Sequence, residues 1–472
     1  MESILLFIPS LILRLVSANQ SFWLDEGASL VFARLPLTNL FSALLNDFHP
    51  PLFYLFLHFW LPLAGNTEWV IRLPFIILGA LCVPVLYKLL LELLGREKKK
   101  VALVASLLLM INPLHTYYSA ELRMYSANAL FSLLSWLYLL RAVKDKTQNP
   151  MPWRFFTLFT VLNVYSFYGA FFNLAAQWLF LYWQHRKKIK PFLVSNLVTT
   201  LFFLPWLLSF FKQLAGGGYL TRALPDWAEL SGNLSPKSLG LIMAKFTFGR
   251  ISLANKSAYA VFVAGISLYF LLCSYLASLA KEGKALLVWF YGALAVAILV
   301  SLRAPVLGYW RFVFLVPAFV SIITLGLSNL PGIANKLNLF VVFLVFVLGN
   351  LIFWTTPALH REDWREAGRL IAKDKSLSIV NFPDVFAPLK FYAPGVYFYP
   401  DQEKLGKMRP DLDQSLPLVL TGKETVFVFD YLSDLTDPKR SILTWLTRAG
   451  FKQNPTHNVN GVGFVYEFSA PK

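Results

Sequence analysis

The sequence is poor in charge and in cysteine, and it lacks internal repeats. Only 15% of its 472 residues are charged, against about a quarter in typical soluble domains, while 57% are hydrophobic. The two cysteines, Cys82 and Cys273, lie inside apolar runs and therefore form neither a disulfide framework nor a metal-ligand set. The absence of a repeat of fixed period disfavours the class of transporters that are built from internal repeats.

The apolar residues instead gather in repeated runs of about 17–22 residues, the length that crosses a bilayer as a helix. The first run has no basic segment before it and no small-residue cleavage site after it, so we do not expect a cleavable signal peptide. The sequence predicts a polytopic all-α membrane protein with about 11 spans. These are about 3–19, 70–94, 101–117, 124–142, two short spans within 155–184, then 191–210, 258–279, 285–301, 312–328 and 338–356.

The formal net charge of +17 reflects topology rather than nucleic-acid binding, because the basic residues occupy short loops between apolar runs. Three such loops are 96–100, 141–146 and 186–190. The positive-inside rule places them in the cytoplasm. We therefore expect a plasma-membrane protein with a cytoplasmic N-terminus and an extracytoplasmic C-terminus, and we expect Arg14 to snorkel toward the surface.

Two basic loops flank residues 155–184, so this segment must cross the membrane an even number of times. We expect a hairpin that turns near Tyr168–Gly169. About 15 residues in each arm cover only about 23 Å, so the turn should be recessed beside a thinned bilayer or a water-filled cavity.

The chain divides by composition into a transmembrane domain, 1–356, and a small α/β domain, 357–472, on the outer side. The second domain alternates helix-like segments (363–374, 438–450) with strand-like ones (376–382, 425–431, 461–469). Two long outer loops are expected in the first domain. The loop 20–69 carries two interfacial helices, 27–35 and 50–64, and the loop 211–257 is a candidate lid because of its three glycines.

An adjacent pair of acids, Asp25 and Glu26, lies in the first outer loop. Carboxylates beside a bilayer are costly, which favours a functional role. Neighbouring residues on a helix point about 100° apart, so the two cannot flank one sugar as a glycosidase pair does. One of them would act as a base and the other as a positioning group. The alternative is that both complement the dipole at the start of a helix.

The other polar outliers also fall on the predicted outer side: His49, Glu121, Arg123, Tyr125, Arg303 and Arg311. Glu121 and Arg123 form either a loop ion pair or an acid beside a phosphate-reading arginine. Arg303 and Arg311 are either membrane anchors or a phosphate clamp, since arginine offers a fork of donors that matches phosphate oxygens. His49 has no second histidine nearby, so the sequence predicts no metal site.

The motifs WLDE, DFHPPLFYLFLHFW, EWVIRLP and NPLHTYYSAELRMYS resemble the N-terminal pattern of bacterial GT-C glycosyltransferases related to protein O-mannosyltransferases and to the lipid A aminoarabinose transferase. The family's usual forms are DE, HPPLYY, RLP and EARMY. Leu122 replaces the frequent alanine, and Phe167 stands where the family often has histidine. GYWRF at 308–312 and DWREAG at 363–368 are similar to later family motifs.

The resemblance implies a GT-C fold and transfer of a sugar from a polyprenyl phosphate to a hydroxyl group, with inversion. The acceptor is a protein, a lipid or a glycan. In this scheme Asp25 is the base, and Glu121 orients the acceptor or a divalent cation, although the sequence itself assigns no cofactor. A departing phosphate needs no acid but does need cations, which Arg123, Arg303 or Arg311 can supply, with His49 and Tyr125 in the donor site.

Two other functions use similar residues. A transporter or flippase for a lipid-linked sugar would place polar groups along a whole transmembrane path, and this sequence has few such groups. A ligase or polymerase would transfer a whole lipid-linked glycan with nearly the same chemistry.

Overall fold

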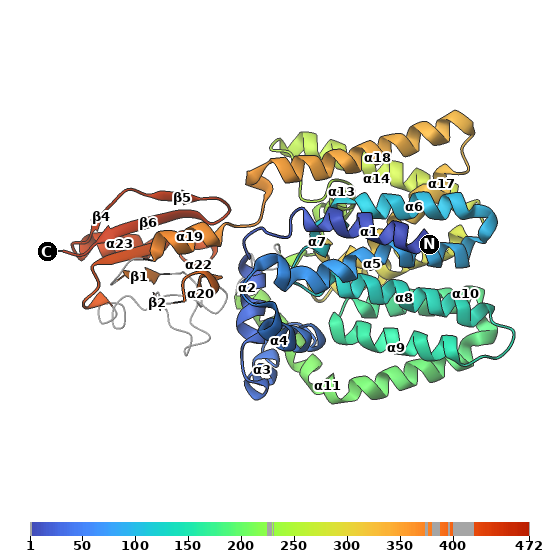
Figure 1. The fold of residues 1–472 in the computed structure, drawn as a ribbon, viewed down its shortest axis with the longest axis horizontal. Coiled ribbons are helices and arrows are strands. Elements are labelled where there is room, and N and C mark those ends of the chain that lie inside the picture. The colour runs from blue at the N-terminus through green and yellow to red at the C-terminus, as the bar shows by residue number, and fades with distance from the viewer. Residues whose placement is uncertain are drawn as a thin grey trace. The chain divides into compact units, whose positions relative to one another are not determined.

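The computed structural model describes residues 2–223, 229, 231–372, 376–379, 388–394, 397–399 and 420–471. The chain forms two compact units (Figure 1). The first unit comprises Met1–Ala18, Phe41–Phe56 and Trp69–Thr355, and the second comprises Asn19–Leu40, Leu57–Glu68 and Thr356–Lys472. The C-terminal region thus forms one unit with two segments of the first outer loop. The predicted boundary between residues 356 and 357 stays a prediction.

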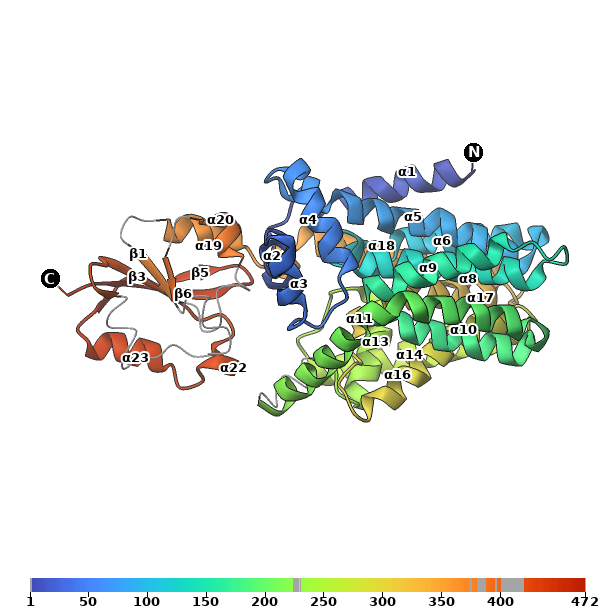
Figure 2. The same cartoon turned by 90° about the horizontal axis from the view of Figure 1, so that it is seen from below.

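The first unit is a bundle of helices that run side by side (Figures 1 and 2). Helix α8 packs on α9, which packs on α11, and α17 packs between α14 and α6. The bundle contains α1 (Glu2–Leu15), α5 (Glu68–Leu94), α6 (Lys99–Ile111), α7 (Pro113–Ser119), α8 (Tyr125–Lys144), α9 (Met151–Ser166), α10 (Ala170–Gln184), α11 (Ile189–Ala223), α13 (Pro236–Phe248), α14 (Lys256–Ser278), α15 (Gly283–Leu287), the π-helix η3 (Val288–Gly292), α16 (Ala293–Ser301), the 3₁₀ helix η4 (Tyr309–Leu315), α17 (Val316–Leu327) and α18 (Gly332–Thr355).

The prediction of a polytopic helical membrane protein is confirmed. Among the described residues, seven helices are long and apolar enough to span a membrane, and the bent pair α6–α7 is an eighth candidate. The three other predicted spans correspond to α1, α9 and α10, which have 14, 16 and 15 residues. The predicted hairpin is present, since α9 ends at Ser166 and α10 begins at Ala170.

The third predicted span is broken rather than continuous, because α6 and α7 meet at Asn112 with a bend of 59°. A break within a membrane helix exposes carbonyl groups that need other donors. Asn350 of α18 donates to the Ile111 carbonyl at 2.7 Å, and Arg14 of α1 donates to the Met110 carbonyl at 3.4 Å. The side chain of Arg14 is fully buried, so the expectation that it snorkels is wrong.

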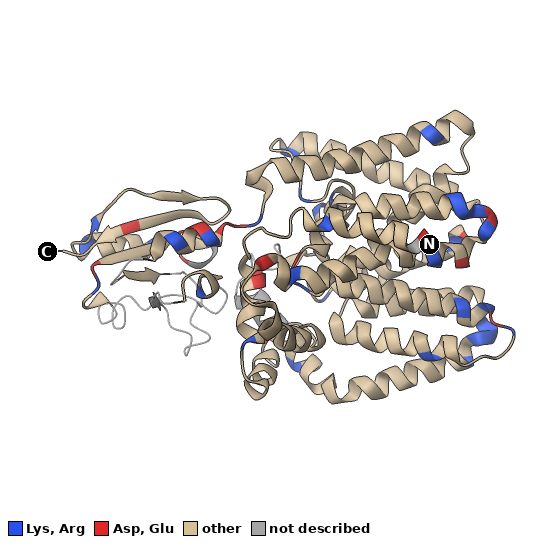
Figure 3. Ribbon diagram, in the orientation of Figure 1, with Lys and Arg blue, Asp and Glu red and all other residues tan. Residues whose placement is uncertain are grey.

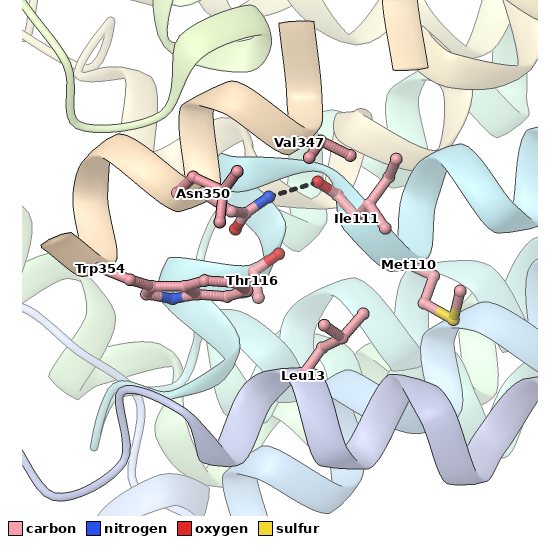
Figure 4. A pocket seen from close by; sticks show the side chains of 8 residues that line it. Leu13, Met110, Ile111, Thr116, Val347, Asn350 and Trp354 are labelled. Atoms are coloured by element: carbon pink, nitrogen blue, oxygen red, sulfur yellow. Dashed lines mark hydrogen bonds between the residues drawn. The ribbon is translucent and has the colours of Figure 1, made fainter. Parts of the chain in front are cut away.

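The residues around this break line a cavity of about 100 Å³ (Figure 4). Its walls come from α1, α6, α7 and α18 and are mostly apolar. The figure shows the Asn350 amide bonded to the Ile111 carbonyl at the cavity wall, which explains how the polar break is accommodated among hydrophobic side chains. The lining residues are Leu13, Met110, Ile111, Thr116, Val347, Asn350, Leu351 and Trp354.

The interval predicted as a lid-like loop, 211–257, is largely helical where it is described. Helix α11 continues through Gly216–Gly218 to Ala223, and α13 occupies Pro236–Phe248. Three glycines weaken an isolated helix but do not prevent one inside a longer element. Of this interval, residues 224–228 and 230 lie outside the described residues.

The first outer loop contains three helices. They are α2 (Leu24–Ala33), α3 (Leu37–Leu44) and α4 (Leu52–Ala64). The sequence predicted α2 and α4 but missed α3. Pro51 immediately precedes α4 and its carbonyl accepts from the Leu55 amide at 2.9 Å, as expected for proline at the start of a helix.

The second unit contains a mixed β-sheet between two helical layers (Figure 2). Within the described residues the strand order is β2-β1-β3-β6-β4, and β5 also pairs with β6. Strands β1, β2 and β3 are parallel, whereas β6 is antiparallel to β3. The strands are β1 (Ser376–Ile379), β2 (Tyr397–Tyr399), β3 (Thr425–Phe429), β4 (Lys452–Gln453), β5 (His457–Val459) and β6 (Gly463–Ser469).

Alternation along β3 builds the two cores of this unit. Phe427 and Phe429 face α19 (Trp364–Ile371) and α20 (Leu389–Tyr392), whereas Val426 and Val428 face α23 (Ser441–Arg448). The short helices η5 (Pro357–Leu359) and α22 (Ser433–Thr436) complete the unit. The predicted helices and the three predicted strands of the C-terminal domain correspond to α19, α23, β1, β3 and β6.

We predict that Asn350→Leu lowers the free energy of unfolding by about 1–3 kcal/mol, because the Ile111 carbonyl would lose its donor in an apolar environment. Thermal unfolding in detergent measures this effect. Leu348→Ala is the control, since Leu348 lies on the same helix, is 45% exposed and should change stability little. Equal stability of Asn350→Leu and wild type would contradict the role of Asn350 at the break.

Candidate functional site

The first unit is strongly basic at one end of its bundle (Figure 3). Lys188 donates to the Asp145 carbonyl at 2.8 Å, and Lys144 pairs at 3.8 Å with Glu92, which lies just before the loop 96–100, so three basic loops lie together. Lys98 also pairs with Glu282 at 2.8 Å. Helix α8 runs from Tyr125 to Lys144 at this basic end, so its N-terminus lies at the opposite end. We call that opposite end the distal end. It holds the predicted site residues of the first unit: His49, Glu121, Arg123, Tyr125, Arg303 and Arg311.

The centre of the distal end is a chain of hydrogen bonds between Arg123, His49 and Asp47. The guanidinium Nη2 of Arg123 lies 3.2 Å from His49 Nε2, and His49 Nδ1 lies 3.1 Å from Asp47 Oδ2. The hydroxyl of Tyr54 donates to the same carboxylate oxygen at 2.8 Å. Arg123 is 4% exposed, so its charge is held inside the protein by this chain.

The donor pattern fixes the tautomer of His49. Arginine has only donors, so His49 Nε2 must accept from Arg123. The proton of the neutral ring then lies on Nδ1 and is donated to Asp47. Asp47 therefore orients the imidazole, and the imidazole orients the guanidinium.

The surroundings of Asp47 favour the ionised form of its carboxyl group. Burial raises the pKa of its carboxyl, but His49, Arg123 and Tyr54 outweigh burial, so the pKa lies below the ordinary value of 3.8. The sequence analysis did not select Asp47, although it belongs to the DFHPP motif. The sequence signal that could have identified Asp47 is a carboxylate two residues before His49.

Aromatic rings extend the chain away from His49. Phe167 stacks on His49 with 6.2 Å between ring centroids, and Tyr125 meets Phe167 edge to face at 5.7 Å. Tyr125 contacts Tyr118 at 5.0 Å, and Tyr118 contacts Tyr117 at the same distance. The structure thus brings the predicted residues His49, Arg123 and Tyr125 into one cluster.

Arg250, which the sequence analysis missed, lies at the far end of these rings. Its guanidinium is 5.2 Å from the ring centre of Tyr117 and donates to the hydroxyl of Tyr309 at 3.2 Å. Buried Lys245 supports the loop, because its ammonium donates to the Arg250 carbonyl at 3.2 Å and to the Ile251 carbonyl at 2.9 Å. No local motif marks Arg250, since only the fold brings it to Tyr117.

Glu121 is a buried acid in the same turn as Arg123. Its side chain is fully buried, its carbonyl accepts from the Arg123 amide at 2.8 Å, and its carboxyl interacts electrostatically with Arg250. A buried acid requires compensating charge. Arg250 provides such charge near Glu121.

Arg303 lies between α16 and η4, and Arg311 lies within η4. The Arg311 guanidinium donates to the carbonyls of Ser231 and Pro305 and lies 5.5 Å from the ring centre of Trp310. These contacts fasten two loops. Arg303 is exposed just after α16.

Asp25 and Glu26 belong to the second unit, in the first turn of α2. Glu26 is fully buried, accepts from the Trp23 amide at 3.3 Å and pairs with Arg361 at 3.9 Å. Asp25 is partly exposed. Glu26 therefore serves the local structure, as a group that complements the start of α2, whereas Asp25 remains accessible.

No group of three or more histidine, cysteine, aspartate or glutamate residues suited to a metal ion occurs in the part of the chain that the structure describes. Cys82 and Cys273 are both buried free thiols.

We predict that Asp47→Asn lowers the free energy of unfolding by about 1–3 kcal/mol at pH 7, because charge-assisted bonds to His49 and Tyr54 are lost. The pKa of Asp47 is depressed in the folded state, so its contribution is present above pH 3.8 and disappears as the pH falls through the folded value. Thermal unfolding in detergent at neutral and acidic pH measures both parts.

Glu97→Gln is the control for Asp47→Asn, since Glu97 is exposed and the charge change is identical. The assignment would be wrong if Asp47→Asn destabilised the protein equally at neutral pH and at an acidic pH at which Asp47 is protonated in the folded state.

Comparisons with known proteins give a family match and a shared fold. Residues 48–209 match the family model described as dolichyl-phosphate-mannose-protein mannosyltransferase, a range that contains His49, Glu121, Arg123 and Tyr125. A search of curated proteins found no match.

Solved structures share the fold over the whole chain. ArnT from Cupriavidus metallidurans, in the apo state and bound to undecaprenyl phosphate, superposes with a TM-score of 0.63 at 12% identity, covering 99% of each chain. The oligosaccharyltransferase AglB from Archaeoglobus fulgidus, solved with an inhibitory peptide and a dolichol-phosphate, gives a TM-score of 0.54 at 11% identity. That match covers 99% of this chain and 74% of AglB. The chain is thus similar to the mannosyltransferase family model over residues 48–209, and it shares the fold of ArnT and AglB over 99% of its length.

Proposed function

We propose that the protein transfers a sugar from a polyprenyl-phosphate donor to a hydroxyl acceptor at the outer face of the plasma membrane. The observation that carries the proposal is the group of Arg123, Glu121 and Arg250 at the distal end of the bundle, in which Glu121 and Arg123 are buried and Arg250 is exposed. Two guanidinium groups beside one acid suit a ligand that carries a phosphate and a hydroxylated sugar.

The cations supply what the leaving group needs. When the bond between the anomeric carbon and the phosphate oxygen breaks, the phosphate takes the electron pair and gains negative charge. Preorganised donors in a site of low dielectric stabilise such charge strongly. Arg123 is preorganised by His49 and Asp47, and Arg250 by the ring of Tyr117 and the hydroxyl of Tyr309. The relatives that were solved with undecaprenyl phosphate and with a dolichol-phosphate support this donor class.

Asp25 is the base in this proposal. It accepts the proton of the acceptor hydroxyl while the oxygen attacks the anomeric carbon opposite the leaving phosphate, so the configuration at that carbon inverts. Partial exposure of Asp25 agrees with access by an acceptor. Glu26 is unsuited to this role, because it is buried against Arg361. Glu121 orients the sugar, the acceptor or a divalent cation.

The proposed orientation follows from charge. The loops that contain Arg96, Lys98, Arg141 and Lys188 gather at the basic end of the bundle (Figure 3). The positive-inside rule assigns this end to the cytoplasm and the distal end to the outside. The acceptor, whether protein, lipid or glycan, would then be met at the outer leaflet.

We predict that Asp25→Asn lowers kcat by about 10²–10⁴-fold, the usual contribution of a general base. Transfer of label from a polyprenyl-phosphate sugar measures the rate, and thermal unfolding confirms that the variant is folded. A variant that retained the full rate with an accepted donor would refute the role of Asp25. Donors that carry one sugar or an oligosaccharide separate this proposal from a ligase or polymerase.

We predict that Arg250→Met lowers kcat/KM for the lipid-linked donor by about 10²-fold or more, since one stabilising contact to the developing charge is lost. Arg154→Met is the matched control. Arg154 is an exposed arginine near the start of α9, at the end of this helix that lies away from the distal end. Equal rates for the two variants would exclude Arg250 from the donor site.

A further inference from the structure

The second unit joins the C-terminal domain to the segment that carries Asp25. Four residues of the C-terminal domain bind the backbone or the acids of residues 19–27. Tyr392 accepts from the Phe22 amide at 2.8 Å, and Arg365 donates to the Asn19 carbonyl at 2.9 Å. Arg361 pairs with Glu26, and Glu362 accepts from the Leu24 amide at 3.2 Å.

The contact of Glu362 is notable because of where it falls on α2. Leu24 is the first residue of this helix, and its amide is one of the groups that a helix leaves without an intrahelical acceptor. The preceding residue, Trp23, has no side-chain oxygen with which to cap it. Glu362 therefore provides from the C-terminal domain the carboxylate that a capping residue would normally provide. The capped residue directly precedes Asp25.

Glu362 is itself held firmly. Its Oε2 accepts from the Trp364 indole at 2.6 Å as well as from Leu24, and its Oε1 accepts from the Tyr431 hydroxyl at 2.6 Å. A carboxylate with three donors inside a packed unit has a fixed position. Burial raises the pKa of Glu362 and the charge of Asp25 adds to this effect, while the three donors oppose it. Asp25 is thus an electrostatic neighbour of Glu362.

Tight packing along α2 leaves little freedom for the helix. A Cβ atom at Gly27 would lie 2.8 Å from the Cα of Pro388, so α2 approaches the chain before α20 as closely as only glycine allows. The start of α2 is therefore fixed at Leu24 by a hydrogen bond and at Gly27 by contact. Asp25 lies between these two points.

We propose that Glu362 of the C-terminal α/β domain is a positioning residue for Asp25. It caps the first turn of α2 and so fixes the backbone from which the base projects. This inference rests on the proposed function, in which Asp25 is the base. A displacement of about 1 Å is enough to cost a catalytic group about 10²-fold in rate.

The experiment compares Glu362→Ala with Glu362→Gln in the full-length protein, in detergent, with a labelled polyprenyl-phosphate sugar as donor. Glu362→Ala removes the acceptor for the Leu24 amide and should lower kcat about 10-fold or more, with KM for the donor unchanged. Glu362→Gln keeps an oxygen acceptor and should restore kcat to within a few-fold of wild type. Glu366→Ala, an exposed glutamate on α19, is the control and should leave both constants unchanged.

Asp25→Asn separates this inference from the proposed function. In the Asp25→Asn background, Glu362→Ala should cause no further loss of the residual rate, because Glu362 acts through Asp25. Full activity of Asp25→Asn alone would overturn the proposed function. A large loss for Asp25→Asn together with normal kcat for Glu362→Ala would overturn the positioning role only.

If Glu362→Ala does not fold, Tyr431→Phe decides the question. This variant removes one donor to Glu362 and leaves the contact with Leu24 in place. We expect a loss of kcat of a few-fold at unchanged KM and with a normal thermal transition. An unchanged kcat for folded Tyr431→Phe would overturn the role of Glu362.

Discussion

In the first unit, polar groups lie in apolar surroundings, and each of them needs a hydrogen-bond partner or a counter-charge. The break at Asn112 exists only because Asn350 and Arg14 reach the carbonyls that it releases. The same requirement places Arg123, since a guanidinium that is 4% exposed demands an acceptor and a counter-charge, which His49 and Asp47 supply. The polar groups at the break and those at the candidate site are thus held by the same requirement for a partner.

The second unit meets a comparable requirement with different groups. The first amides of α2 are satisfied by two glutamates, Glu26 within the helix and Glu362 from the C-terminal domain. Arg361 compensates the buried charge of Glu26, and the hydroxyl of Tyr431 supports Glu362. Removing one partner of a buried pair destabilises a protein more than the intact pair stabilises it, because the other charge is left uncompensated. The two acids of α2 are therefore unequal, because Glu26 is fully buried and Asp25 is partly exposed.

Much of the fold followed from the sequence because its signals are local. Hydrophobic run length predicted the spans, and the strand-like segments 425–431 and 461–469 predicted β3 and β6. The break at Asn112 was missed, because it depends on contacts with α18 and α1. The helix through Gly216–Gly218 and the short helix α3 were also missed. Arg14 shows the same limit, because its burial is decided by Met110 and His115, about a hundred residues away.

The candidate site divides in the same way. His49, Arg123 and Tyr125 were predicted from motifs, and the structure connects them through the aromatic ring of Phe167. Arg250 was not predicted, because it belongs to no motif and is distant in sequence from Tyr117, whose ring its guanidinium covers. The sequence did not show which groups Arg311 contacts. In the structure its guanidinium donates to the carbonyls of Ser231 and Pro305.

Phe167 bears on how the proposed reaction is driven. It stands at a position where related enzymes often have histidine, and here it offers only a ring face to His49 and to Tyr125. A phenyl ring neither gives nor takes a proton, so no acid can act on the leaving group from this position. His49 is equally unsuited to be an acid while it accepts from Arg123 and donates to Asp47. Charge stabilisation by arginine is then the chemistry left to this part of the distal end, and a phosphate leaving group requires no more than that.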